Sequence, residues 1–231
     1  MNLAAEIKLL TVDLDDTLWP CMPTIMRAED TSYEWLKQHC PKITRCYSIQ
    51  DLRKKRLQLM NAQPGLMNDL SAARRAHFRE LADEFGYNHD WIEPGFKVFH
   101  DARQLVDLYE DVLPALSQLK STFKLIALTN GNADIAKVGL AEYFDFQISA
   151  ADVSAAKPHP AMFVEAMHRS RVSPRQTLHI GDHAVHDIAG ARNAGIRSVW
   201  LNRGGGPWPE QDFSADFEVS DMNGLIELFN L

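Results

Sequence analysis

Short apolar runs that end in acidic, polar or glycine residues recur along most of this 231-residue chain. Each run is strand-length and rich in β-forming residues, and runs of this kind are typical of strands buried in a parallel sheet. The clearest runs are 8–14, 123–128, 177–180 and 198–201, and Phe146–Ser149 is expected to form a further strand. The pattern predicts an α/β fold with a doubly wound parallel (Rossmann-like) sheet, in which ligands bind beyond the carboxyl ends of the strands.

Segments of helical character lie between these runs. Ile135, Val138 and Leu140 are expected to lie on a helix before the Phe146–Ser149 strand. Pro160 suits the first turn of another helix, and Gly195 is expected to end a third.

The stretch from about residue 21 to residue 105 has few strand signals and several helical ones. We therefore expect residues 1–20 and 106–231 to form the α/β core domain, and residues 21–105 to form an inserted helical cap domain. Two apolar helix faces indicate the insert: Leu70, Ala73, His77, Leu81 and Phe85 on one, and Ile25, Ala28, Trp35 and Leu36 on the other.

Charge and cysteine content exclude several functional classes. A net charge of −7 and a pI near 5.7 argue against nucleic-acid binding, so the basic run 53–56 is interpreted as a solvated helix face. The longest apolar runs are strand-length, so no membrane contact is expected. Three cysteines without paired spacing favour reduced thiols and a cytoplasmic location. The expected assembly is a monomer or a homodimer.

An acidic motif ends the first predicted strand. Asp13 and Asp15 lie two residues apart, and Thr17 follows at the same spacing. Both carboxylates can approach one reacting centre where the chain turns, and their mutual repulsion is relieved by a cation. Mg²⁺ is the obvious candidate because it prefers hard oxygen ligands. An acidic surface turn is the alternative interpretation of this motif taken by itself.

Polar residues also follow the other predicted strands. Thr129 and Asn130 offer a hydroxyl, an amide and backbone N–H groups to an anion, or else form a helix-capping turn. Lys157 lies between alanines and prolines, as a counter-charge or as an ordinary surface lysine. Asp182 ends a strand, and Asp187 falls in the first turn of a helix, where it could merely complement the helix dipole.

Taken in order, these motifs read D-x-D-x-T, T-N, K-P and G-D-x-x-x-x-D. This order resembles the four sequence motifs of the haloacid dehalogenase (HAD) superfamily of hydrolases. The resemblance covers the core segments 8–19 and 109–231, and the insert matches the helical C1 cap found after the first motif in that superfamily.

The resemblance implies a phosphoryl-transfer mechanism. Asp13 would attack phosphorus and form an aspartyl-phosphate, and Asp15 would act as general acid and then as general base. Thr129, the backbone of Asn130, and Lys157 would hold the phosphate, with Lys157 also balancing the charge of the nucleophile.

A metal site also follows from the resemblance. Mg²⁺ would be held by Asp13, by the backbone carbonyl of Asp15 and by Asp182. Asp187 would orient water or Lys157 from behind these ligands.

Asp15 favours a phosphate ester over a carbon–halogen substrate. Superfamily members that expel halide lack an acid two residues after the nucleophile, because halide needs no proton, whereas an alkoxide does. A phosphosugar mutase, a 2-haloacid dehalogenase and a catalytically silent phosphate-binding module remain the alternatives. The expected partner is a small-molecule phosphate ester.

The segments 129–133, 139–144 and 200–202 resemble a bacterial branch of capped phosphatases that acts on flavin mononucleotide and on 5-amino-6-(5-phospho-D-ribitylamino)uracil. This points to riboflavin biosynthesis. Trp19, with Met22 and Met26, would stack on a flat ring or else pack the cap.

Histidines mark a departure from that branch. His183 and His186 stand in the last motif where polar or acidic residues are expected. Together with His179 and Asp182 they raise the alternative of a zinc site, but His179 should point away from its strand neighbours.

Overall fold

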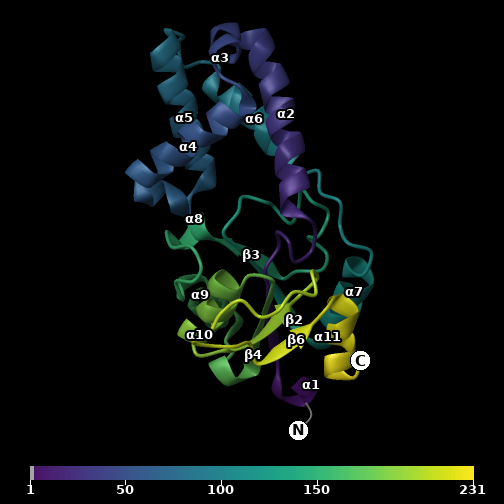
Figure 1. The fold of residues 1–231 in the computed structure, drawn as a ribbon. Helices are drawn as coiled ribbons and strands as arrows, with labels where there is room; N and C mark the ends of the chain where they lie inside the picture. The colour runs from purple at the N-terminus through teal and green to yellow at the C-terminus, as the bar shows by residue number, and fades with distance from the viewer. Residues whose placement is uncertain (1–2) are drawn as a thin grey trace. The chain divides into compact units, whose positions relative to one another are not determined.

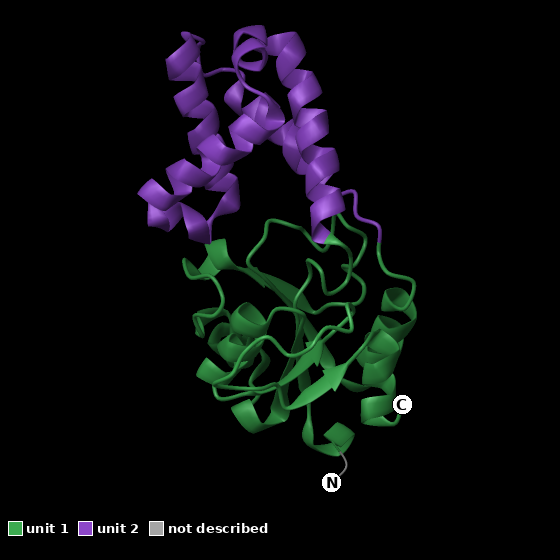
Figure 2. Ribbon diagram, viewed as in Figure 1, with its two compact units in different colours: residues 1–20, 108–231 green, residues 21–107 purple. Residues whose placement is uncertain are grey.

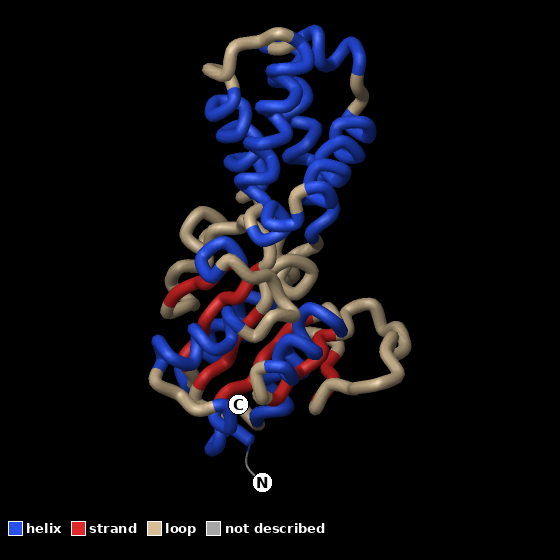
Figure 3. Tube along the Cα trace, turned by 90° about the vertical axis from the view of Figure 1, so that its left-hand side faces the viewer, coloured by secondary structure: helices blue, strands red, loops and turns tan. Residues whose placement is uncertain are grey.

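The computed structural model describes residues 3–231, which divide into two compact units (Figure 2). Unit 1 combines the chain up to Pro20 with Leu108–Leu231, and unit 2 is Cys21–Asp107. All strands belong to unit 1, as the red segments of Figure 3 show.

Unit 1 is built on a six-stranded, all-parallel sheet with the order β3-β2-β1-β4-β5-β6. This confirms the predicted doubly wound α/β fold. The strands are β1 (Leu9–Val12), β2 (Lys124–Thr129), β3 (Phe146–Ser149), β4 (Thr177–Gly181), β5 (Arg197–Leu201) and β6 (Phe217–Val219).

The strand order places the predicted acidic motifs at a topological switch point. β1 is central and pairs with β2 on one side and β4 on the other, with Thr11 opposite both Ile126 and His179. Connections run outward from β1 in both directions, so the carboxyl ends of β1 and β4 border a crevice. The residues after these two strands are therefore brought together.

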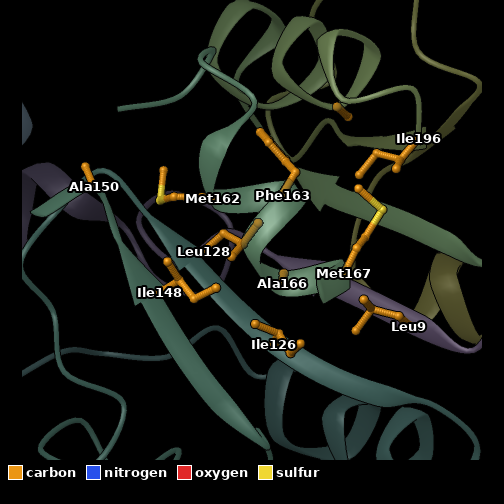
Figure 4. Packing of buried hydrophobic residues seen from close by; sticks show 11 residues of the cluster. Leu9, Ile126, Leu128, Ile148, Ala150, Met162, Phe163, Ala166, Met167 and Ile196 are labelled. Atoms are coloured by element: carbon orange, nitrogen blue, oxygen red, sulfur yellow. The ribbon is translucent and has the colours of Figure 1, made fainter. Parts of the chain in front are cut away.

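Helices cover both faces of the sheet (Figure 1). On one face, Met162, Phe163, Ala166 and Met167 pack on apolar residues of β1, β2 and β3 (Figure 4). The helices of unit 1 are α1 (Leu3–Glu6), α7 (Val112–Thr122), α8 (Ala150–Val153), α9 (Ala161–Ser170), α10 (Gly190–Asn193) and α11 (Met222–Phe229). Shorter or wider helical turns are η2 (Pro174–Gln176) and the π-helix η3 (Ala184–Ala189).

Two details of unit 1 differ from the prediction. Residues 134–143 form turns instead of a helix, although Ile135 and Leu140 are buried, and Gly139 has a φ of 81° that a regular helix does not accommodate. The edge strand β6 was not expected, because only three residues pair and none of them is fully buried.

Unit 2 is entirely helical in the described residues, and its core gathers the two predicted apolar faces. Ala73 and Leu81 of one face and Ala28 and Leu36 of the other are buried. Its helices are α2 (Cys21–His39), α3 (Pro41–Cys46), α4 (Ile49–Ala62), η1 (Pro64–Asn68), α5 (Leu70–Phe85) and α6 (Ile92–Arg103). No helix within residues 3–231 is long and apolar enough to cross a membrane.

The basic run 53–56 lies on α4 and is solvated only in part: Lys54 is exposed, whereas the other three cations also pair with carboxylates of other helices. Arg53 and Arg56 bind the carboxylate of Glu29, and Lys55 pairs with Glu84 at 3.0 Å. Helix packing, which the local sequence does not reveal, turns three of the four cations toward other helices.

Candidate active site

Asp13 follows β1 directly and is held in the ladder, since its N–H donates to the Ile180 carbonyl at 2.9 Å. Its side chain is only 7% exposed. Thr17, fully buried, donates toward Asp13 Oδ2 at 3.1 Å and lies 3.2 Å from Asp182 Oδ1. Thr17 therefore links the first acidic motif to the last one. It stands in the D-x-D-x-T motif of the sequence, but the motif alone predicted no role for it.

Lys157 is buried between two carboxylates. Its ammonium lies 2.5 Å from Asp13 Oδ1 and 2.6 Å from Asp187 Oδ1, and it also donates to the Leu128 carbonyl at 3.0 Å. Burial alone would lower the pKa of Lys157, but the two carboxylates outweigh it and raise the pKa above its ordinary value. Lys157 is thus a fixed positive charge, not a surface lysine.

Asp187 is buried in the π-helix η3 and accepts hydrogen bonds at both oxygens. Oδ1 receives Lys157, and Oδ2 accepts from the N–H of His183 at 3.0 Å. Burial would raise its pKa, but Lys157 and then His179 lower it below the ordinary range. The interpretation of Asp187 as a residue that only complements a helix dipole is not what the structure shows.

Gly181 explains how Asp187 comes so close to the strand. A Cβ atom at position 181 would lie 2.3 Å from Asp187 Cγ, far inside contact distance. The Gly-Asp pair of the last motif therefore needs its glycine for a close approach of side chain to backbone.

His179 is a residue of this cluster that sequence reasoning did not place there. Its Nε2 lies 3.1 Å from Asp187 Oδ1, and its Nδ1 lies 2.9 Å from the Thr11 hydroxyl. Since an ionised Asp187 only accepts, the proton between them belongs to Nε2, and Thr11 then donates to Nδ1. The available signal was a polar residue in the middle of an otherwise apolar strand.

One oxygen from each of Asp13, Asp182 and Asp187 lies within 4.8 Å of the others, a grouping that could hold a metal ion among residues 3–231. Burial raises the pKa of Asp182 to about 7, and the neighbouring Asp187 and Asp16 add to the effect. Burial likewise raises the pKa of Asp13 well above its ordinary value; Lys157 opposes this, whereas Asp187 and Asp182 reinforce it.

The raised pKa values of Asp13 and Asp182 indicate that too little positive charge surrounds these two buried carboxylates. A bound hard cation would supply it, because oxygen donors suit such a cation. Asp187 already accepts from three donors, so Asp13 and Asp182 are the side chains better placed to ligate.

Thr129 is the last residue of β2, and Asn130 follows it directly. The Thr129 hydroxyl accepts from the Gly131 N–H at 2.9 Å. The Asn130 side chain binds the backbone of Lys157 on both sides, donating to its carbonyl at 3.0 Å and accepting from its N–H at 2.7 Å. The amide of Asn130 therefore positions the lysine loop, which leaves the residue's backbone for any anion contact.

Asp15 lies outside the group of carboxylates that could hold a metal ion in the described chain. Its Oδ1 accepts from Trp19 Nε1 at 2.9 Å. Of the two alternatives for Trp19, its complete burial supports packing and not stacking on a flat ring, and its indole also holds Asp15. Met22 and Met26 are each 51% exposed and do not pack a core.

The other histidines do not converge on Asp182 as zinc ligands. His183 and His186 stack on each other with ring centroids 4.0 Å apart. His183 Nδ1 accepts from the N–H groups of Val185 and His186, which caps η3.

Known proteins are similar to this chain over most of its length. A family model described as haloacid dehalogenase-like hydrolase matches residues 7–195. The chain is 28% identical over 200 residues to the 5-amino-6-(5-phospho-D-ribitylamino)uracil phosphatase YigB of Escherichia coli K12, covering 85% of this chain and 84% of that protein. It is 29% identical over 246 residues to a phosphoserine phosphatase of Thermus thermophilus, covering 95% and 98%.

Solved structures share the fold. A structure titled 2-haloacid dehalogenase from Pseudomonas syringae pv. Tomato DC3000 is 38% identical with a TM-score of 0.91, covering 97% of this chain and 98% of that chain. A HAD phosphatase from Thermococcus onnurineus is 24% identical with a TM-score of 0.69, covering 96% and 97%, and supports the fold alone.

Proposed function

The chain belongs to the haloacid dehalogenase-like hydrolase family, and from this premise we propose that it is a metal-dependent phosphatase of small-metabolite phosphate monoesters. The observation that carries the proposal is the pairing of Asp13 with Lys157 in a buried, acidic cluster, with a second carboxylate, Asp15, held just outside it. The Lys157 ammonium balances the charge of the Asp13 nucleophile. The leaving alcohol needs a proton donor whose side chain does not hold the metal.

In the first step, an Asp13 oxygen bonds to phosphorus as the ester P–O bond breaks. Asp15 gives its proton to the leaving oxygen, which departs as an alcohol. In the second step, Asp15 takes a proton from water, the water oxygen bonds to phosphorus, and the P–O bond to Asp13 breaks, which releases phosphate. Lys157 and the Thr129 hydroxyl neutralise or bind the oxygens on which charge develops.

Mg²⁺ is the cation we propose for the acidic cluster, held by Asp13, the backbone carbonyl of Asp15 and Asp182. When bound it supplies positive charge that phosphoryl transfer requires. Asp187, which accepts from Lys157 and His179, orients the lysine.

The substrate class is supported by relatives whose names give phosphorylated small metabolites. We propose 5-amino-6-(5-phospho-D-ribitylamino)uracil as the first candidate and flavin mononucleotide as the second. Trp19 does not contribute to this choice because it is buried.

A 2-haloacid dehalogenase is the second candidate, favoured by the 38% identical structure of that title. In that reaction Asp13 would displace halide from carbon, and halide leaves without a proton. Asp15 would then have no acid–base task, which is why we place the phosphatase first.

The test is a panel of metabolite phosphates and 2-haloacids, with and without Mg²⁺, in which phosphate and halide release are both measured. We expect Mg²⁺-dependent phosphate release that Asp13→Asn abolishes and that Asp15→Asn lowers by about 10²–10⁴-fold, the usual contribution of a general acid. Asp212→Asn is the control, because Asp212 is exposed and lies outside the acidic cluster. Halide release that survives Asp15→Asn, with no phosphate released, would replace the phosphatase by the dehalogenase.

A further inference from the structure

Unit 2 contains a pocket of its own, lined by residues of α2, α4 and α5. Figure 1 labels these three helices. The empty volume of the pocket is about 320 Å³ when the open space at its mouth is included. The residues that line it are Glu29, Ser32, Tyr33, Leu36, Ile49, Leu52, Arg53, Arg56, Arg74, His77 and Phe78. All of them belong to unit 2, so the pocket does not depend on where unit 1 lies.

The charges in this pocket do not balance. Three guanidinium groups, those of Arg53, Arg56 and Arg74, surround one carboxylate, that of Glu29. Arg53 Nε donates to Glu29 Oε2 at 3.0 Å and Arg56 Nη2 to Oε1 at 2.7 Å, whereas Arg74 Nη2 is 3.7 Å from Oε1. The cluster carries two positive charges more than its own carboxylate neutralises.

Arg74 is the least satisfied of the three cations. Its side chain is 8% exposed, and its guanidinium carbon lies 3.2 Å from the centre of the Phe99 ring, which fixes the plane of the group. Burial and then the charge of Arg56 lower the pKa of Arg74. An added negative charge in the pocket would relieve both effects.

His77 gives an independent indication of a missing ligand. It is 1% exposed, it lines the pocket, and neither ring nitrogen has a hydrogen-bond partner. Burial and then the charges of Arg56 and Arg74 hold the pKa of His77 at about 3, so the ring is neutral and carries one N–H donor. A buried polar group without a partner is unfavourable for folding, so it marks a place where a ligand can complete the structure.

We propose that this pocket binds a small oxyanion, either a phosphate or a carboxylate group, between the guanidinium groups of Arg53, Arg56 and Arg74, with a hydrogen bond from His77. Planar guanidinium groups bind both oxyanions with paired N–H···O bonds. The inference goes beyond the proposed hydrolysis and does not rest on it, because the pocket shares no residue with the acidic cluster of unit 1.

The test uses the full chain in chelator without Mg²⁺, so that phosphate finds no cation at the acidic cluster of unit 1, and it titrates inorganic phosphate in one arm and succinate in the other. The ring nitrogens of His77 are followed by NMR and are assigned by their loss in His77→Phe. We expect one of the two anions to shift these signals and to raise Tm by roughly 5 °C at about 100 times Kd. Whichever arm responds identifies a phosphate or a carboxylate as the ligand.

Three variants separate this site from binding elsewhere. Arg56→Gln and His77→Phe should each lose most of the Tm response, and His77→Phe should itself unfold at a higher temperature because it removes the unpartnered nitrogens. Arg45→Gln removes an exposed arginine of the same unit that does not line the pocket, and it should respond like wild type. Unmoved His77 signals in both arms, or an equal Tm response in His77→Phe and wild type, would overturn the proposal, whatever the outcome for phosphate release.

Discussion

Each unit holds a cluster of charged side chains around buried groups, and the two clusters are of opposite composition. In unit 1 one ammonium lies among three carboxylates, those of Asp13, Asp182 and Asp187. In unit 2 one carboxylate lies among three guanidinium groups, those of Arg53, Arg56 and Arg74.

The difference between the two clusters shows how an excess of one charge over the other inside a protein can indicate a ligand. Charges taken out of water are unfavourable unless opposite charges and hydrogen bonds compensate them. A balanced cluster can be explained by folding alone, whereas a surplus indicates a ligand of opposite sign. By this criterion unit 1 needs a cation and unit 2 an anion.

The largest expected effect breaks the balance of unit 1. Lys157→Met leaves its two carboxylate partners without their shared cation, and it removes charge stabilisation from the reacting oxygens. We expect kcat/KM for the best phosphate ester to fall by about 10²–10³-fold, the usual effect of losing one such group. The measurement is steady-state phosphate release at saturating Mg²⁺.

The control is Lys120→Met, which removes an exposed lysine on α7. It should leave kcat/KM near wild type. A Lys157→Met enzyme within threefold of wild type would mean that Mg²⁺ alone can balance the cluster.

The corresponding change in unit 2 is Glu29→Gln, which leaves three guanidinium groups without their carboxylate. Breaking a buried ion pair in this way costs about 3–5 kcal/mol in the free energy of unfolding, measured with urea. Glu80→Gln, an exposed change on α5, should cost less than about 0.5 kcal/mol. If phosphate is the ligand, it should stabilise Glu29→Gln more than wild type; a loss below 1 kcal/mol would show that the cluster is well solvated.

A smaller effect tests the geometry behind Asp187. Gly181→Ala places a methyl group where Asp187 now lies, so Asp187 must shift and Lys157 with it. We expect kcat to fall by about 10–100-fold, since small misplacements are costly in catalysis. Gly65→Ala is the control, because a Cβ atom there would meet nothing within 4 Å. Equal kcat values for the two variants would show that Asp187 has room to adjust.

Much of unit 1 was predictable from the sequence, because its signals are local. The strands around 9–12 and 177–181 were found as apolar runs, and their polar ends identified Asp13 and Asp182. Residue roles that depend on register across the sheet were not found. His179, for example, lies opposite Thr11 of β1 and hydrogen-bonds to its hydroxyl, although the two residues are 168 positions apart in the chain.

The cluster of unit 2 was not predictable for a related reason. Glu29 and its partners Arg53, Arg56 and Arg74 are 24 to 45 positions apart and lie on three helices. Helical periodicity gives each helix a buried face, but it does not say how the helices are rotated against one another. A basic run was therefore interpreted as solvated when two of its members bind a buried carboxylate.

The clusters should also respond to pH with opposite signs. The pKa of Asp182 is raised to about 7 in unit 1 without metal, so its favourable contribution is present at low pH and is lost as the pH rises through about 7. In chelator, Tm should therefore fall between pH 5 and pH 8 by roughly a few degrees. Asp182→Asn should flatten this dependence, Asp212→Asn should not, and Mg²⁺ should restore Tm at pH 8.

The contribution of Glu29 to stability changes with pH in the opposite direction. Burial would raise its pKa, but hydrogen bonds from Arg53 and Arg56 lower it, so its contribution is present above its ordinary pKa and is lost on acidification below that value. Glu29→Gln should therefore make Tm less sensitive to acid below about pH 4. If Asp182→Asn and Glu29→Gln changed the pH dependence of Tm in the same direction, the two clusters would not be of opposite kind.

The smallest expected effect concerns the one carboxylate of the first motif that stands apart from the acidic cluster. Trp19 donates to Asp15 Oδ1, and Trp19→Phe removes that donor while keeping most of the buried ring. If the bond only positions Asp15, kcat should fall about three- to tenfold with KM little changed, and Trp19→Phe should have no further effect in an Asp15→Asn background. Trp91→Phe serves as the control, since its indole N–H has no partner to lose. An additive loss in the double variant would mean that Trp19 acts on the reaction independently of Asp15. The Trp19–Asp15 hydrogen bond would then not be what keeps the acid–base residue apart from the metal cluster.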